Sequence, residues 1–151
     1  MAARKAPAPT EAMEQQALIT WWRWWCKTKG LDERLLFAIP NGAVLAGDAR
    51  KRAIQMNNLK KTGLQAGLPD LMLAIEKSIN DDAKGIPYPE KVAFMNPIVL
   101  FHGMFIELKR IGGKLSPVQL EMCDLLRRSG YNVIVAQGAD EAIRAIKAYL
   151  E

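Results

Sequence analysis

The segment Phe105-Ile106-Glu107-Leu108-Lys109 constrains the fold more than any other part of the chain. It is typical of a β-strand, in which successive side chains point to opposite faces, so Ile106 and Leu108 share one face while Glu107 and Lys109 share the other. Two opposite charges beside each other fit either a solvated strand at the edge of a sheet or a functional site. The rest of the sequence decides between these interpretations.

Length and composition predict a single globular domain. The chain has 151 residues, of which 50% are hydrophobic and 25% charged, as in ordinary soluble domains with a full core. The net charge of +5 suits a polyanionic partner. Cys26 and Cys123 form no C-x-x-C motif and His102 is the only histidine, so a structural zinc site is not expected. No apolar run is long enough for a membrane span or a signal peptide, which predicts a cytoplasmic protein without a membrane partner.

The first helix is predicted to carry an acid on its apolar side. Residues 1–9 are small, basic and proline-rich, and a flexible tail is expected there. Thr10 is the expected N-cap of a helix from Glu11 to about Lys27. Its apolar stripe consists of Leu18, Trp21, Trp22 and Trp25. Glu14 lies on the same stripe, where a carboxylate is costly unless it is paired or binds a cation; alternatively, it is a first-turn acid that the helix dipole favours.

A basic helix is predicted after a short strand at residues 35–39. Asp48 is its expected N-cap, and it runs from Ala49 to about Leu59. The cations in and after this helix are Arg50, Lys51, Arg52, Lys60 and Lys61. Such a face is often merely solvated, but five cations within twelve residues also make it the best candidate for phosphate contacts. Lys114, in a later glycine-containing turn, is a further candidate.

Asp70 stands where a loop ends and a strand begins, directly after a proline that fixes its approach. The apolar run Leu71–Ile75 forms the strand, and two further strand pieces are expected between residues 92 and 109. The second piece is predicted to pair antiparallel with the Asp70 strand, which brings Asp70 to Glu107 at one edge of the sheet. Residues from about 77 to 103 are predicted to be an insertion.

The last third of the chain has an explicit helix start. Ser116 is the expected N-cap, Pro117 takes the first helical position, and Gln119 completes a capping box. The side chains expected to face the core are Val118, Met122, Leu125 and Leu126. A strand at residues 131–136 follows, and then a helix that Asp140 is expected to cap. This order predicts an α/β fold with a central mixed sheet flanked by helices.

Two carboxylates that converge on one point predict a hard divalent cation. Asp70 and Glu107 would repel each other without one, and Mg²⁺ accepts one or two carboxylates together with water. The backbone carbonyl of Leu108 is a candidate third ligand. Such an ion activates water and stabilises charge on a phosphoryl group, and Lys109 would orient or help to deprotonate that water, or neutralise negative charge. The predicted chemistry is phosphodiester hydrolysis with Mg²⁺ or Mn²⁺.

These motifs resemble those of a nuclease superfamily. The run Gly67-Leu68-Pro69-Asp70, followed by Glu107-Leu108-Lys109, resembles the PD-(D/E)-x-K signature of the restriction-endonuclease-like nucleases. Gln119, ten residues after Lys109, is similar to its counterpart in the VRR-NUC branch, the virus-type replication-repair nucleases. The resemblance covers about residues 11–150 and implies one nuclease domain over residues 10–151.

The resemblance also implies roles for individual residues. Asp70 and Glu107 would be metal ligands, Lys109 the catalytic lysine and Glu14 an auxiliary acid and possible ligand. Gln119 would face the site, although its capping role explains it equally well. Family members are divalent-metal-dependent, structure-selective DNA nucleases, and stand-alone forms from bacteria and viruses are similar to homodimeric Holliday-junction resolvases. We therefore expect a homodimer acting on branched DNA in a bacterial or phage-infected cell; the alternatives are a flap- or end-directed nuclease and a non-catalytic DNA-binding module.

Overall fold

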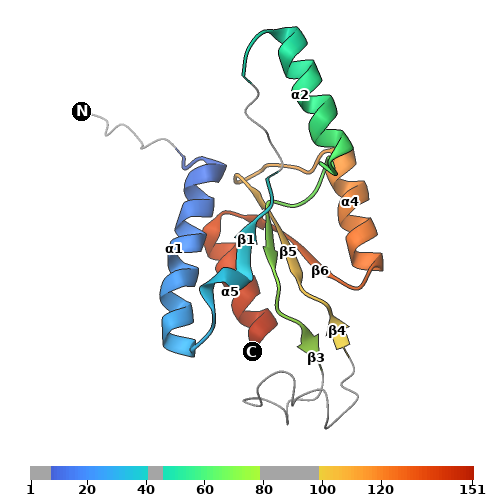
Figure 1. Ribbon diagram of the computed structural model, residues 1–151. Coiled ribbons are helices and arrows are strands. Elements are labelled where there is room, and N and C mark those ends of the chain that lie inside the picture. Colours follow the sequence, from blue (N-terminus) through green and yellow to red (C-terminus); the bar gives the residue numbers. More distant parts are fainter. Residues whose placement is uncertain (1–7, 41–45, 79–98) are drawn as a thin grey trace, which may run out of the picture.

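A four-stranded mixed sheet forms the centre of the fold (Figure 1). The computed structural model describes residues 8–40, 46–78 and 99–151. The strands, in spatial order, are β1 (Leu36–Ala38), β2 (Leu71–Leu73), β5 (Met104–Lys109) and β6 (Asn132–Gln137). β2 is antiparallel to both of its neighbours, whereas β5 and β6 are parallel. The predicted mixed sheet is therefore confirmed.

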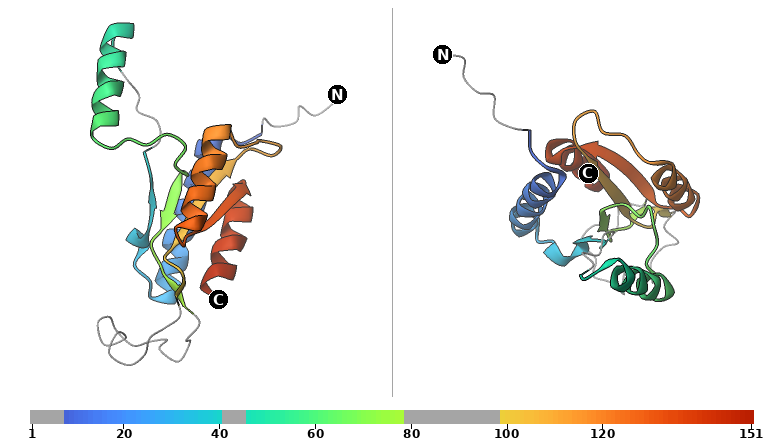
Figure 2. Two further views of the ribbon diagram at one scale, coloured as in Figure 1. Left: turned by 90° about the vertical axis from the view of Figure 1, so that its right-hand side faces the viewer. Right: turned by 90° about the horizontal axis from the view of Figure 1, so that it is seen from above.

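Helices cover both faces of this sheet (Figure 2). α1 (Glu11–Lys29) and α5 (Ala139–Leu150) pack on one face, and α4 (Pro117–Arg128) packs on the other. The larger core, under α1 and α5, includes Leu18, Trp22, Leu71, Ile106, Leu108 and Ile146. The smaller core, under α4, centres on Phe105, Cys123 and Val133. The side chains of β5 thus alternate between the two faces, as its sequence predicts. None of the described helices is long and apolar enough to cross a membrane.

The tryptophan stripe of α1 packs against the larger core. Trp22 and Trp25 are buried, and Trp21 stacks on Trp25 with ring centroids 5.4 Å apart. Thr10 caps the helix by accepting a hydrogen bond from the N–H of Met13. The helix runs slightly beyond the predicted end, to Lys29, and a left-handed glycine follows it.

α2 (Ala49–Lys61) projects from the body of the molecule as an arm (Figures 1 and 2). Asp48 is its N-cap, as predicted, and accepts a hydrogen bond from the N–H of Lys51. None of its residues is buried. The arm leaves and rejoins the body at the end of the sheet where β2 begins.

The predicted insertion is visible only at its two ends. β3 (Lys77–Ser78) and β4 (Val99–Phe101) pair antiparallel as a separate two-stranded sheet. Residues 79–98, which make up most of the insertion, lie outside the described residues, as do residues 1–7 of the predicted tail. The strand predicted at residues 35–39 is shorter, because a 3-10 turn, Glu33–Leu35, precedes β1.

Two predictions about the C-terminal helices are wrong. Asp140 does not cap α5; the N-cap is Gly138, so Asp140 lies within the first turn. Val118 and Leu125 were expected to face the core, but their exposed fractions are 50% and 49%. The reason is the rotation of α4, which directs Cys123 rather than these residues toward the sheet.

Candidate active site

Glu107 and Lys109 lie on a central strand of the sheet, which rules out the interpretation as a solvated edge. β5 has β2 on one side and β6 on the other. Because Leu71 pairs with Ile106, Asp70 stands beside Glu107 just before β2 begins. The Oδ2 atom of Asp70 accepts a hydrogen bond of 2.8 Å from the N–H of Leu108. The structure thus brings together the three charged residues that the sequence assigned to one site.

Glu107 is the only buried polar or charged side chain among the described residues, with an exposed fraction of 1%. Its Oε1 atom accepts hydrogen bonds from Nζ of Lys109, at 2.5 Å, and from Nε2 of Gln119. Its Oε2 atom has no hydrogen-bond partner within the described part of the chain. A buried carboxylate oxygen without a partner is costly, which indicates that a ligand completes its environment.

The electrostatics of the site favour a bound cation. Burial raises the pKa of the carboxyl groups of both Asp70 and Glu107, and in Glu107 the neighbouring Asp70 charge adds to this effect. Burial also acts to lower the pKa of Lys109, but the hydrogen bond and the charge of Glu107 outweigh it, so the pKa lies above its ordinary value. Lys109 is therefore held as an ammonium group, and one ammonium faces two carboxylates.

The residues present suit a hard divalent cation. Three oxygen donors are available on neighbouring residues of β5 and at the start of β2: Oε2 of Glu107, the second oxygen of Asp70 and the carbonyl of Leu108. The N–H and C=O of a strand residue point to the same side, and the N–H of Leu108 points to Asp70, so its carbonyl does too. The described residues contain no cluster of three or more His, Cys, Asp or Glu residues able to hold a metal. Two carboxylates and a carbonyl match the preference of Mg²⁺ rather than that of a soft metal.

Gln119 completes the predicted capping box and also contacts Glu107. In the capping box, its N–H donates to Oγ of Ser116, and its Oε1 accepts from the N–H of Ser116. Its Nε2 atom remains available and donates to Glu107. The start of α4 therefore fixes the orientation of the buried carboxylate and leaves Oε2 for a ligand.

The loop before Asp70 approaches the start of α4 so closely that it needs a glycine. Gly67 has φ 80°, and a Cβ atom there would lie 2.6 Å from the carbonyl oxygen of Val118. Only glycine meets both conditions without strain. Pro69, which is buried, then directs Asp70 into the site.

Glu14 lies at the start of α5. Its Oε2 atom accepts a hydrogen bond of 2.8 Å from the N–H of Ala139. The structure therefore gives Glu14 a backbone partner, which explains why a carboxylate lies on the apolar side of α1. This contact supplies the cap that Asp140 was wrongly expected to provide.

Glu11 is an acid in the same turn of α1, and it was not among the predicted site residues. Its Oε1 atom accepts a hydrogen bond of 3.3 Å from the N–H of Arg110, next to Lys109. Burial is the main cause of the raised pKa of Asp70 and of Glu107, and the charge of Glu11 adds to the rise in both. Its position three residues before Glu14 places it on a neighbouring part of the helix surface, and this spacing could have identified Glu11 as a second candidate acid.

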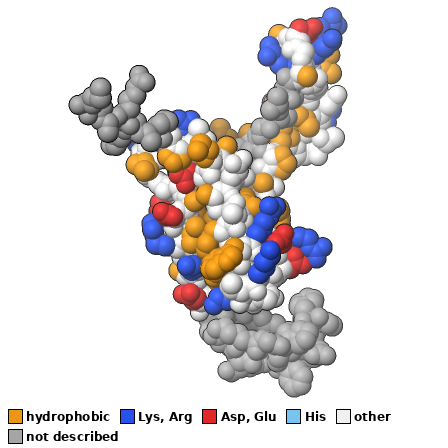
Figure 3. Space-filling view, turned by 90° about the vertical axis from the view of Figure 1, so that its left-hand side faces the viewer, with side chains coloured by type: hydrophobic (Ala, Val, Ile, Leu, Met, Phe, Trp, Pro, Cys, Tyr) orange, Lys and Arg blue, Asp and Glu red, His pale blue; other side chains and the backbone are white. Residues whose placement is uncertain are grey.

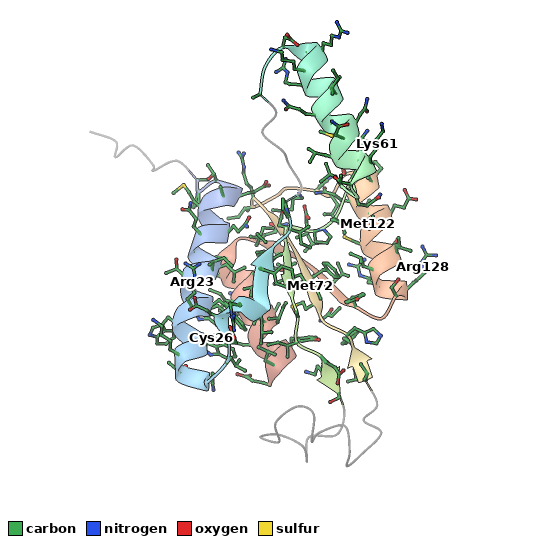
Figure 4. All side chains as sticks on the ribbon, viewed as in Figure 1. Arg23, Cys26, Lys61, Met72, Met122 and Arg128 are labelled. Atoms are coloured by element: carbon green, nitrogen blue, oxygen red, sulfur yellow. The ribbon has the colours of Figure 1, made fainter. Side chains whose placement is uncertain are left out.

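The predicted DNA-binding cations lie outside this site, on the arm α2 and in the turn after β5. Lys114 is exposed in the turn between β5 and α4. The exposed cations of α2 are Arg50, Lys51, Arg52, Lys60 and Lys61. Figure 3 shows basic side chains at the outer end of the arm, and Figure 4 shows Lys61 at the end that rejoins the body.

Comparisons with known proteins identify the fold and the family. The VRR-NUC domain model matches residues 9–140 of the chain. A solved structure of a VRR-NUC domain protein superposes with a TM-score of 0.67 and 23% sequence identity, over 95% of this chain and 90% of that chain. This likeness shows a shared fold. No curated protein matches the chain. Because the family model covers most of its length, the chain belongs to the VRR-NUC family of nucleases.

Proposed function

We propose that the protein is a Mg²⁺- or Mn²⁺-dependent DNA endonuclease that hydrolyses phosphodiester bonds in branched DNA such as Holliday junctions. The observation that carries the proposal is the buried Oε2 atom of Glu107, which has no hydrogen-bond partner among the described residues and lies beside Asp70. A carboxylate with a purely structural role would have both oxygens paired. The membership of a nuclease family supports the same reaction.

Asp70, Glu107 and the carbonyl of Leu108 would hold the ion. When bound, a divalent cation lowers the pKa of a coordinated water and neutralises charge on the phosphoryl group. Gln119 orients the carboxylate of Glu107 toward that position. Glu11 accepts a hydrogen bond from the N–H of Arg110 and adds a negative charge near Asp70 and Glu107.

Lys109 would stabilise the transition state as a cation. In the metal-free site the pKa of its amine is held above the ordinary value by Glu107, although burial opposes this. As an ammonium group it would donate hydrogen bonds to the attacking water and to the charged phosphoryl oxygens. Fixed donors of this kind in a partly buried site are worth about 10²–10³ in rate.

The surface around the site supports DNA as the substrate. The basic arm α2 projects from the end of the sheet where β2 begins, and Lys114 follows the last residue of β5. The chain has a net charge of +5. Val118 and Leu125 form an exposed apolar flank on α4 that a second copy of the chain would cover. A two-fold dimer built on this flank would present two sites to opposite strands of a junction, which would suit a branched substrate.

The test is a cleavage assay with Mg²⁺ on four-way junctions, flaps, nicked duplexes and linear duplexes, with the mass in solution measured in parallel. Wild-type protein should cut the junction, and Lys109→Ala should cut it at least about 100-fold more slowly. Lys27→Ala, which removes an exposed cation at the far end of α1, is the matched control and should cut normally. Junction cleavage by Lys109→Ala at the wild-type rate would exclude this site. If wild-type protein cut flaps or ends faster than the junction, the proposed substrate would be flaps or ends instead of four-way junctions.

A further inference from the structure

We propose that one exposed face of α2 enters a groove of the DNA beside the cleavage site and contacts bases as well as phosphates. The inference rests on the proposed function, because it takes DNA as the substrate. It goes further by assigning base contacts, and hence a preference among DNA sequences, to a helix outside the catalytic centre.

The arm is free to contact another molecule. It contains no buried residue, and Ile54 has an exposed fraction of 52%. The partly covered side contains Gln55, whose side chain is hydrogen-bonded to both the N–H and the C=O of Ala46. This contact ties one side of the helix to its own connecting segment and leaves the opposite side open (Figure 1).

The open side has an ordered pattern. Arg50, Ile54, Asn57 and Lys61 are spaced by four, three and four residues, which places them on one face of the helix. All four side chains are exposed. A cation therefore stands at each end of the face, with an apolar and an amide side chain between them. Residues 53–59 contain no charge of either sign.

This pattern matches the chemistry of a DNA groove. At about 1.5 Å per residue, Arg50 and Lys61 lie about 16 Å apart along the axis, and the major groove is about 12 Å wide. The two cations can thus reach phosphates on its rims while the middle of the helix faces the bases. An asparagine amide pairs with adenine through one donor and one acceptor, and an aliphatic side chain contacts the thymine methyl group. A helix that contacted only phosphates would not need an uncharged segment between its cations.

The position of the arm connects these contacts to catalysis. Figure 4 shows Lys61 at the end of α2 that meets the body, and only residues 62–69 separate it from Asp70. DNA held by this end of the arm would therefore lie on the side of the molecule where β2 begins and Asp70 stands. The five cations of α2 give this surface a charge opposite to that of its proposed occupant.

The experiment measures binding of the full chain to two four-way junctions in EDTA, so that no cleavage occurs, across a range of salt concentrations. The junctions differ only in having A·T or G·C pairs next to the branch point. Arg50→Ala and Lys61→Ala should each reduce the salt slope by about one and weaken binding to both junctions equally. Asn57→Ala should leave the slope unchanged and reduce the preference between the junctions by about tenfold. The matched controls Lys27→Ala and Gln16→Ala, exposed on α1, should bind as wild type.

The outcomes separate this inference from the proposed function. Unchanged slopes in Arg50→Ala and Lys61→Ala, or an unchanged preference in Asn57→Ala, would overturn the groove contact even if wild-type protein cuts DNA with Mg²⁺. If the three variants bind as expected but wild-type protein does not cut DNA with Mg²⁺, the groove contact is supported and the nuclease function is refuted. Ile54→Ala tests the other occupant: a fall in mass from dimer to monomer would make this face an interface between two copies and overturn the inference.

Discussion

Glu14 and Ala139 are joined by a hydrogen bond that spans 125 residues of the chain. α5 has no capping side chain of its own, since its N-cap is a glycine with φ 89°. A Cβ atom at Gly138 would lie 3.2 Å from Oε2 of Glu14, so the glycine also makes room for the carboxylate. One helix thus supplies the cap of another, and a negative charge meets the positive end of the helix dipole.

The substitution Glu14→Ala should lower the free energy of unfolding by about 1 kcal/mol, because it removes the cap of α5. Glu14→Gln should cost less, since its amide oxygen can still accept from Ala139. Urea denaturation measures both values. Glu121→Ala, exposed on α4, is the control and should stay within about 0.5 kcal/mol of wild type. Equal stability of Glu14→Ala and wild type would contradict the capping role.

The substitution Glu11→Gln should slow cleavage by about tenfold or more while leaving the free energy of unfolding nearly unchanged. Its charge acts on Asp70, Glu107 and Lys109, whereas its single backbone contact is exposed. Glu14→Gln should show the reverse, with near-normal cleavage by the folded protein. Cleavage rates at saturating Mg²⁺, corrected for the folded fraction, provide the comparison. If Glu14→Gln were the slower enzyme, the sequence-based choice of Glu14 would be right.

The sequence predicts the centre of the site because local rules determine it. Alternation along β5 places Glu107 and Lys109 on one face, and antiparallel pairing of β5 with β2 brings Asp70 beside them. The capping box at Ser116 places the start of α4. Each of these features depends on short stretches of chain, and the structure agrees with all of them.

The remaining features depend on contacts between distant segments. Glu11 and Glu14 are three residues apart, and only the way α1 lies across the sheet decides which one contacts Arg110 and which one contacts α5. The 3.6-residue period likewise allows more than one apolar face on α4. The hydrogen bond from Gln119 to Glu107 is consistent with the observed rotation, which leaves Val118 half exposed. Helical periodicity alone contains no information about these choices.

The substitution Gly67→Ala should be more damaging than Gly63→Ala, although both glycines have a positive φ. Both variants have backbone strain, which costs about 1–2 kcal/mol. Only at Gly67 would the new Cβ atom also meet the carbonyl of Val118, at 2.6 Å, whereas nothing lies within 4 Å at Gly63. The loop would have to move, and Asp70 with it, so Gly67→Ala should also bind Mn²⁺ more weakly. Urea denaturation and calorimetric titration with Mn²⁺ measure the two effects; equal losses in both variants would count against the close approach.

The substitution Asp70→Asn should stabilise the metal-free protein and abolish cleavage. Burial raises the pKa of the Asp70 carboxyl in the folded state, although the N–H of Leu108 partly opposes it. Stability from such an acid is fully present below its unfolded pKa and is lost as the pH rises through its folded pKa. At neutral pH, therefore, the charge of Asp70 destabilises the metal-free fold. Asparagine removes that charge and keeps an oxygen that can accept from Leu108.

Thermal melts in EDTA should accordingly show a higher Tm for Asp70→Asn than for wild type near neutral pH, and the difference should shrink as the pH falls. Mg²⁺ should raise the Tm of wild-type protein more at about pH 8 than at about pH 5, because the carboxylates must be ionised to bind it. The variant should show little response to Mg²⁺ and cut at least about 100-fold more slowly. If the variant melted below wild type in EDTA and still cut DNA, Asp70 would be a structural residue. A metal ligand, in contrast, destabilises the metal-free fold and is needed to bind the ion.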